Sequence, residues 1–205
     1  MSSQRRSKRE DTRERIIEAA FRLFVERGYH GTSMRQIAQR AGIALGAAYN
    51  HFPGKEELFV AVLAERHPYL AIVPALAEAQ GETVEALVRN AAARMLQGLG
   101  ERLDGLSLVF IELVEFEGRH IPQLSGTVLP YMMSFAQRFA QNRDILRPIP
   151  PGILLRSFVG LFFSYFMTQL LMRDQFPAEQ EVNALDAFVD IYLHGILARP
   201  EERKE

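Results

Sequence analysis

A run of three closely spaced helix signals between Thr12 and Lys55 constrains this chain more than any other feature. A long amphipathic helix is predicted to end at Gly28, a short capped helix follows it, and a turn at Gly42 leads into a second short helix. Helices of about two turns are not stable alone, so the first helix must hold the two short ones. This arrangement is typical of a helix-turn-helix.

The first of these helices has one apolar face. Asp11 and Glu14 have the spacing of a capping box, so this helix is predicted to begin at Asp11. Gly28 supplies the left-handed residue with which a helix commonly ends. The apolar residues recur at the helical spacing i, i+4, i+7, i+8, and they are Ile16, Ala20, Leu23 and Phe24.

The next helix carries a second capping box, formed by Ser33 and Gln36. It is predicted to begin at Ser33 and to stop before Gly42. The side chains expected to pack against the first helix are Met34, Ile37, Ala38 and Ala41.

The segment from Ala44 to Asn50 is made of small, almost uncharged residues, which suits a helix that approaches another surface closely. The major groove of DNA is about 12 Å wide and admits one such helix. A helical hairpin inside a bundle would have the same pattern. Hydrogen-bond donors that can hold phosphates on both edges of a groove favour DNA, and these are Ser33, Arg35, Tyr49, His51 and Lys55.

Four stretches together resemble the N-terminal domain of the TetR family of transcriptional regulators. They are TRERIIEAAFRLF from Thr12, RGYHGTSMRQIA from Arg27, and AGI from Ala41 followed by YNHFPGKEEL from Tyr49. The resemblance covers about a quarter of the chain without a gap, and the combination is more specific than any one motif. It implies an all-helical homodimer that represses transcription until a small ligand binds the C-terminal domain.

The resemblance also implies roles for individual residues. Tyr49, His51 and Lys55 would hold phosphates, and Arg35 with the exposed side of 44–50 would contact bases. Ala44 and Leu45 depart from the family pattern, which often has Ser or Thr and frequently Lys at these places, so neither a side-chain cap nor a phosphate contact is expected there. The complete set of expected DNA-binding residues is Ser33, Arg35, Ala44, Leu45, Gly46, Ala47, Tyr49, Asn50, His51 and Lys55.

Composition indicates a cytoplasmic protein. The chain has 205 residues, 48% of them hydrophobic, and no cysteine, which excludes disulfides and cysteine-based zinc sites. The basic first residues have no apolar region behind them, so no signal peptide is expected. The most apolar stretch, 153–172, is interrupted by Arg156 and is not expected to span a membrane.

Charge is distributed unevenly along the chain. Residues 1–55 hold 11 Lys and Arg against 5 Asp and Glu, a net charge of +6, whereas residues 56–205 hold 13 against 20, a net charge of -7. The basic part therefore coincides with the predicted DNA-binding part. Four cations precede the first helix and are expected to follow the minor groove or an outer phosphate path, or to form a disordered tail: Arg5, Arg6, Lys8 and Arg9.

Beyond Lys55 the pattern remains helical, and the fold class predicted is all-α with about nine helices. A linking helix begins at Glu56, and Pro68 predicts a kink or break near His67. Five further helices are predicted over 83–98, 105–117, 122–142, 152–173 and 179–198. The domains expected are a basic flexible arm over 1–10, a helix-turn-helix domain over 11–55, a ligand-binding and dimerisation domain over 56–199, and a charged tail over 200–205.

The two last helices are candidates for a dimer interface. The helix over 152–173 is apolar nearly all round, and a small domain has little to cover it with. The last helix, over 179–198, carries an apolar stripe formed by Leu185, Phe188, Val189, Tyr192 and Ile196. With their symmetry mates the two helices would form a four-helix interface, which the family resemblance also implies. The alternative is that both stripes form the core of one subunit.

Aromatic residues suggest an apolar pocket between the central helices, although core packing is the alternative for each one. Glu117 lies on the same helical arc as Phe110, and His120 is a candidate to share a site with it. The expected ligand-binding residues are Phe110, Phe116, Glu117, Tyr131, Phe135, Phe162 and Phe166.

An enzyme is not expected. The five histidines lack the His-Glu-x-x-His spacing, and there is neither a phosphate loop nor a Gly-x-Ser-x-Gly elbow. We expect no metal and no cofactor. The partners expected are a double-stranded DNA operator, a small apolar or aromatic ligand and a second copy of the chain. Two alternatives are a dimeric DNA-binding protein without a ligand and a helical interaction module without DNA.

Overall fold

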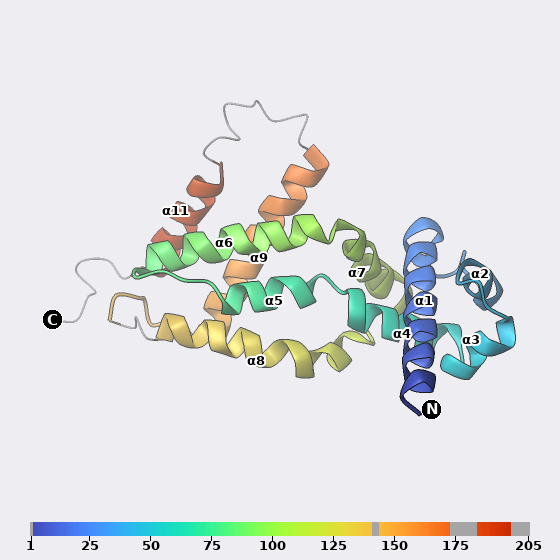
Figure 1. Ribbon diagram of the computed structural model, residues 1–205. Helices are drawn as coiled ribbons and strands as arrows, with labels where there is room; N and C mark the ends of the chain where they lie inside the picture. The colour runs from blue at the N-terminus through green and yellow to red at the C-terminus, as the bar shows by residue number, and fades with distance from the viewer. Residues whose placement is uncertain (1, 141–143, 173–183, 198–205) are drawn as a thin grey trace. The chain divides into compact units, whose positions relative to one another are not determined.

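The computed structural model describes residues 2–140, 144–172 and 184–197, and these are helical almost throughout (Figure 1). The prediction of an all-α fold is confirmed. The described helices are α1 Ser2–Arg27, α2 Met34–Arg40, α3 Leu45–His51, α4 Lys55–Arg66, α5 Tyr69–Ala77, α6 Val84–Glu101, α7 Leu103–Phe116, α8 Ile121–Ala140, α9 Pro151–Met172 and α11 Ala184–Ile196.

The chain forms two compact units. We call residues 1–70 with 102–125 the N-terminal unit, and residues 71–101 with 126–205 the C-terminal unit. The expected division between residues 55 and 56 does not coincide with these units, because α4 and α7 both pack against α1. The apolar face of α1 is thus covered by α4 and α7 as well as by α2 and α3.

The core of the N-terminal unit follows the predicted stripes. The apolar residues expected to face inward on α1 and α2 are all buried, and so are Leu58, Phe59 and Val62 of α4. Phe24 of α1 meets Phe59 of α4 edge to face, with ring centroids 5.4 Å apart. Phe116 of α7 stacks on the other side of Phe59 at 4.9 Å. These rings join α1 and α4 to α7 in one hydrophobic core.

The predicted start of the first helix at Asp11 is wrong. Helix α1 begins at Ser2, and the Thr12 hydroxyl donates a hydrogen bond to the Lys8 carbonyl one turn earlier. Residues 2–10 contain neither glycine nor proline, so nothing stops the helical hydrogen bonding from continuing through Asp11. The residues expected to form a flexible arm thus belong to a helix.

The predicted break near His67 is confirmed. Helix α4 ends at Arg66, and His67 adopts an extended conformation before Pro68, as steric contact with a proline ring requires. The helix predicted to begin at residue 105 begins two residues earlier, because α7 starts at Leu103. Gly105 lies in the first turn of α7, where an added Cβ would stand 2.7 Å from the Arg66 carbonyl oxygen. The glycine therefore permits close packing.

The C-terminal unit is built on contacts among α6, α9 and α11 (Figure 1). Phe158 of α9 contacts Tyr192 of α11 and Phe135 of α8, with centroid distances of 5.6 and 5.4 Å. The Tyr192 hydroxyl donates a hydrogen bond of 2.7 Å to the Leu154 carbonyl. Burial raises the pKa of Tyr192. One cluster of aromatic residues thus holds three helices together.

Part of the expected dimer interface is core of a single subunit. Phe162 of α9 is fully buried in one chain, as are Val189, Tyr192 and Ile196 of α11. An apolar helix does not reveal which neighbour covers it, and here α6 and α11 cover one side of α9. Large apolar side chains of α9 remain exposed at Ile153, Leu170 and Leu171. Among the described helices, α9 alone is long and apolar enough to cross a membrane.

Candidate nucleic-acid interface

The capping box predicted for α2 is present. The Gln36 backbone N–H donates to the Ser33 hydroxyl at 3.3 Å, and the Ser33 backbone N–H donates to Gln36 Oε1 at 2.8 Å. These two reciprocal hydrogen bonds therefore fix the first turn of α2. Arg35, one residue into the helix, is exposed and carries its guanidinium on the outside of this capped turn.

The turn between α2 and α3 is fastened to α1 by Arg15. Gly42 has φ of +65°, a conformation that favours glycine, and an added Cβ would lie 3.0 Å from the Arg15 guanidinium. That guanidinium donates hydrogen bonds to the carbonyls of Ala41 and Gly42. The sequence analysis assigned Arg15 no role. Its role was missed because a contact 26 residues away leaves no local pattern.

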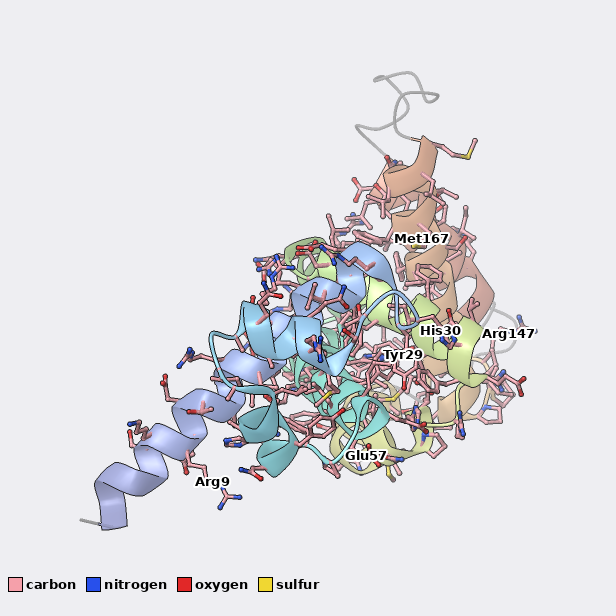
Figure 2. All side chains as sticks on the ribbon, turned by 90° about the vertical axis from the view of Figure 1, so that its right-hand side faces the viewer. Arg9, Tyr29, His30, Glu57, Arg147 and Met167 are labelled. Atoms are coloured by element: carbon pink, nitrogen blue, oxygen red, sulfur yellow. The ribbon has the colours of Figure 1, made fainter. Side chains whose placement is uncertain are left out.

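Helix α3 has one packed face and one open face. Ala48 is fully buried and Leu45 packs, half buried, against the core of the N-terminal unit. Gly46, Tyr49 and Asn50 are exposed, with 48% of Tyr49 accessible. The open face therefore combines a glycine, which allows close approach, with two side chains that carry hydrogen-bonding groups. Figure 2 is viewed from the side on which α2 and α3 lie.

The remaining expected residues stand at the ends of α3. Ala44 is its N-cap and makes no side-chain hydrogen bond, as its methyl group dictates. Ala47 is half buried. His51 ends the helix, and burial, followed by the positive charges of Arg9 and Arg13, lowers its pKa. A neutral imidazole still offers one N–H to a phosphate oxygen.

Lys55 begins α4 and is held by the protein itself. Its Nζ donates to the carbonyls of Tyr29 and Thr32, at 2.8 Å each, and lies 4.0 Å from the centre of the Tyr29 ring. Burial lowers the pKa of Lys55, and Glu115 opposes this shift. The sequence predicted only a phosphate contact for this lysine. In the structure Lys55 fastens the connection between α1 and α2.

Ionisable groups of α7 and of the turn after it contact α4 and the connection between α1 and α2. Glu112 is completely buried and accepts a hydrogen bond from the His120 backbone N–H. Both nitrogens of the His120 ring face carboxylates, Glu112 Oε2 at 2.9 Å and Glu56 Oε1 at 3.3 Å. Glu56 belongs to the first turn of α4. His30, just before α2, pairs in the same way with Glu115 of α7 at 2.7 Å.

The suggested partnership of His120 with Glu117 is wrong. Glu117 ends α7 in the left-handed conformation, with φ of +55°, and its side chain is exposed. The backbone reverses there, so His120 returns to α7 beside Glu112. The signal available in the sequence was a carboxylate inside the otherwise apolar run 108–114.

The expected ligand-binding residues fall into both compact units. Phe110, Phe116 and Glu117 belong to the N-terminal unit, and Phe116 is part of its core. The other four belong to the C-terminal unit, where Phe135 and Phe162 are fully buried and Phe166 is half buried, whereas Tyr131 is exposed. Core packing accounts for Phe116, Phe135 and Phe162.

Comparison with known proteins identifies this architecture. The model of the family "Bacterial regulatory proteins, tetR family" matches residues 16–62, which contain all of α2 and α3. The regulator TtgR of Pseudomonas putida is 47% identical over 199 residues, which cover 95% of this chain and 83% of TtgR. The chain belongs to the TetR family. A second relative of this TetR-family chain, the regulator SrpR of Pseudomonas putida, is 33% identical over 75% of this chain and 70% of SrpR.

Solved structures agree with this assignment. Native NalD, described as the secondary repressor of the MexAB-OprM multidrug efflux pump in Pseudomonas aeruginosa, superposes with a TM-score of 0.65 at 25% identity. The match covers 92% of this chain and 98% of NalD. TetR-family relatives are transcriptional regulators and not enzymes, so the expectation of a regulator is confirmed. Regulators of this family bind DNA, usually as dimers, and respond to small molecules.

Proposed function

We propose that this chain is a cytoplasmic repressor that binds a palindromic operator as a homodimer and leaves it when an apolar or aromatic small molecule binds. The observation that carries the DNA-binding part is the open face of α3, which is small at Gly46 and polar at Tyr49 and Asn50. A helix with that face can lie deep in the major groove and contact base edges. Repression is supported by the likeness to NalD, itself named a repressor.

The proposed roles follow from position on the helix-turn-helix. Arg35 and Asn50 would bind base edges, because guanidinium and amide groups form paired hydrogen bonds with guanine and adenine. Ser33, Tyr49, His51 and Lys55 would hold phosphates on either side of the groove. Leu45 has no such role in the proposal, since it packs on the core.

Dimerisation is proposed through the exposed apolar side chains of α9 and α11. Ile191 of α11 is 61% exposed, and Leu171 of α9 is 74% exposed. In a twofold dimer the same surface of each subunit forms the interface, so the exposed side chains of one copy would be covered by those of the other. Two N-terminal units would then contact the same duplex, and a twofold protein requires a twofold site.

Ligand control is proposed for the C-terminal unit, where Tyr131 and Phe166 are not fully buried. A ligand that binds one dimer arrangement more tightly than another shifts the population towards it, and its effect cannot exceed that difference in affinity. The alternative, a dimeric DNA-binding protein without a ligand, makes the opposite prediction, namely that no small molecule alters operator affinity.

The test is selection of duplexes from a random-sequence library by the full-length protein, followed by footprinting of the selected DNA. We expect a palindromic motif whose two halves are protected equally. A motif with a single half-site would overturn the dimeric proposal, and no enriched motif would overturn specific DNA binding. Titration of apolar and aromatic compounds into the complex then tests release, and a panel without effect would favour the alternative.

A further inference from the structure

The start of α1 is a surface that the helix-turn-helix does not account for. Four cations, two of them Lys8 and Arg9, lie within the first nine residues, and helix α1 begins before all four. The side chains of Lys8 and Arg9 are exposed. In the described part of the chain Arg9 has no ion-pair partner, whereas Arg13, one turn later, pairs with Glu65 at 2.6 Å. Among the described residues, therefore, no carboxylate compensates the charge of Arg9 by an ion pair.

This charge lies beside the end of the proposed recognition helix. The Arg13 guanidinium stands 5.6 Å from the centre of the Phe52 ring, and Phe52 is the C-cap of α3. Arg9 precedes Arg13 by four residues, which places it on the same side of α1 and about 6 Å further along the axis. Figure 2 shows Arg9 leaving α1 on the side where α3 lies. The lowered pKa of His51, after burial, reflects the positive charges of Arg9 and Arg13.

We infer that the exposed side of α1 that carries Arg9 and Arg13, here called the N-terminal basic face, binds backbone phosphates next to the C-terminal end of α3. The inference rests on the proposed DNA binding and extends its interface beyond the helix-turn-helix. Its partner is the outer surface of the DNA backbone, because this face continues the edge of α3 and has the complementary charge.

The helical conformation decides between the two paths open to these cations. An α-helix with its side chains is about 10–12 Å wide, whereas the minor groove is about 6 Å wide, so helical residues do not enter that groove. A helix of this width can instead lie outside the groove, against the phosphates that border the major groove. Contacts of this kind add affinity and salt dependence without sequence preference.

The experiment compares wild type with Arg9→Gln in the full-length protein. Affinity is measured by fluorescence anisotropy on the selected operator duplex and on a random duplex of equal length, from about 50 to about 200 mM salt. We expect Arg9→Gln to weaken both complexes several-fold by the same factor. The slope of log affinity against log salt should become shallower by nearly two units, about 0.9 for each protomer. Arg9→Lys, which keeps the charge, should retain the slope.

The matched control is Arg27→Gln. Arg27 is an exposed arginine at the other end of the same helix, about 27 Å from Arg9. It should leave the slope unchanged. An equal decrease in both variants would mean a general effect of net charge and would overturn the inference. So would a slope for Arg9→Gln that matches wild type.

Two further outcomes separate this inference from the proposed function. If Arg9→Gln alters only the preference for A·T-rich flanks, the residue lies in the minor groove, and the phosphate contact is refuted while DNA binding stands. If the wild-type protein binds no duplex with salt dependence, the proposed function fails together with the inference. Thermal melting should not change in any of these variants, because the replaced side chains are exposed.

Discussion

Glu112 is bound twice by His120: its Oε1 accepts the His120 backbone N–H at 2.7 Å, and its Oε2 lies 2.9 Å from Nδ1 of the ring. The carboxylate is completely buried, so these bonds replace its hydration. The ring's other nitrogen faces Glu56 of α4. The reversed turn after α7 is thereby fixed to the helix that follows the DNA-binding segment.

The first prediction concerns this buried pair. Glu112→Ala should lower the free energy of unfolding by about 3 kcal/mol, because it leaves the bonding groups of His120 buried without their partner. Denaturant unfolding measures the change. Glu115→Ala is the control, since its ion pair with the exposed His30 should contribute less than about 1 kcal/mol. Equal losses in the two variants would show that the burial of Glu112 has no energetic consequence.

A second prediction is pH dependence from His67. Burial lowers the pKa of His67 from 6.5 to about 4, and its Nδ1 accepts the Tyr69 N–H. The unfolded chain therefore takes up this proton at higher pH than the folded chain, and stability is lost as pH falls from about 6.5 towards 4. The full shift corresponds to about 3 kcal/mol.

Unfolding of wild type and His67→Asn at pH 7 and pH 5 tests this dependence. Asn offers an oxygen to the Tyr69 N–H but does not titrate, so it should lose less stability between the two pH values. The assignment to His67 is refuted by parallel losses in the two proteins.

Arg15 should act on specificity through geometry. Arg15 Nη2 donates to both carbonyls of the α2–α3 turn, and Arg15→Lys keeps the charge but has a shorter side chain, whose ammonium does not reach the position of Nη2. We expect operator affinity to fall by about tenfold, a cost of about 1.4 kcal/mol, and the random-duplex affinity to change little. The salt slope should remain that of wild type. A uniform loss on both duplexes would instead assign Arg15 to phosphate binding.

Arg35 is proposed to contact a base, and Arg35→Ala should relax the motif at one position of each half-site. A paired contact to guanine is worth about 1–3 kcal/mol of discrimination. Repeating the duplex selection with the variant measures this directly. Recovery of the wild-type motif would remove Arg35 from the base-contacting set, and the exposed Asn50 would be the next residue to examine.

The dimer prediction now rests on exposed residues. Phe162→Glu does not test the interface, because Phe162 is buried in its own subunit. Ile191→Glu places a charge in the proposed interface and should give monomers with little operator affinity. Leu129→Glu, at a similarly exposed position of α8, should remain dimeric. Light scattering decides, and a dimeric Ile191→Glu protein would exclude α11 from the interface.

Local patterns predicted the helices better than they predicted the contacts between them. The spacing Ser33 to Gln36 forms a capping box, yet the same spacing at Asp11 and Glu14 does not, because the helix continues past it. A cap requires that the chain before it leave the helix, and spacing does not report this. The helix α3 and the exposure of Gly46, Tyr49 and Asn50 were predictable, since the pattern lies within consecutive residues.

The contacts that could not be predicted from the sequence depend on the path of the backbone. Glu112 meets His120 only because residues 117 and 118 both have positive φ, which turns the chain back onto α7. Similarly, Arg15 reaches Gly42 across the packing of two helices. The all-round apolar pattern of α9 gave no means of separating Phe162, which is core, from Leu171, which is exposed.

Lys55 enters the proposed DNA complex already ordered. Two carbonyls and the Tyr29 ring hold its ammonium before any duplex is present. A free lysine would lose its rotamer freedom on binding, at a cost of about 0.5–1.5 kcal/mol. In the folded protein this rotamer freedom is already lost, so a bound phosphate would meet a preorganised cation. The hydrogen bonds that stabilise the α1–α2 connection would therefore also reduce the side-chain entropy that Lys55 loses when DNA binds.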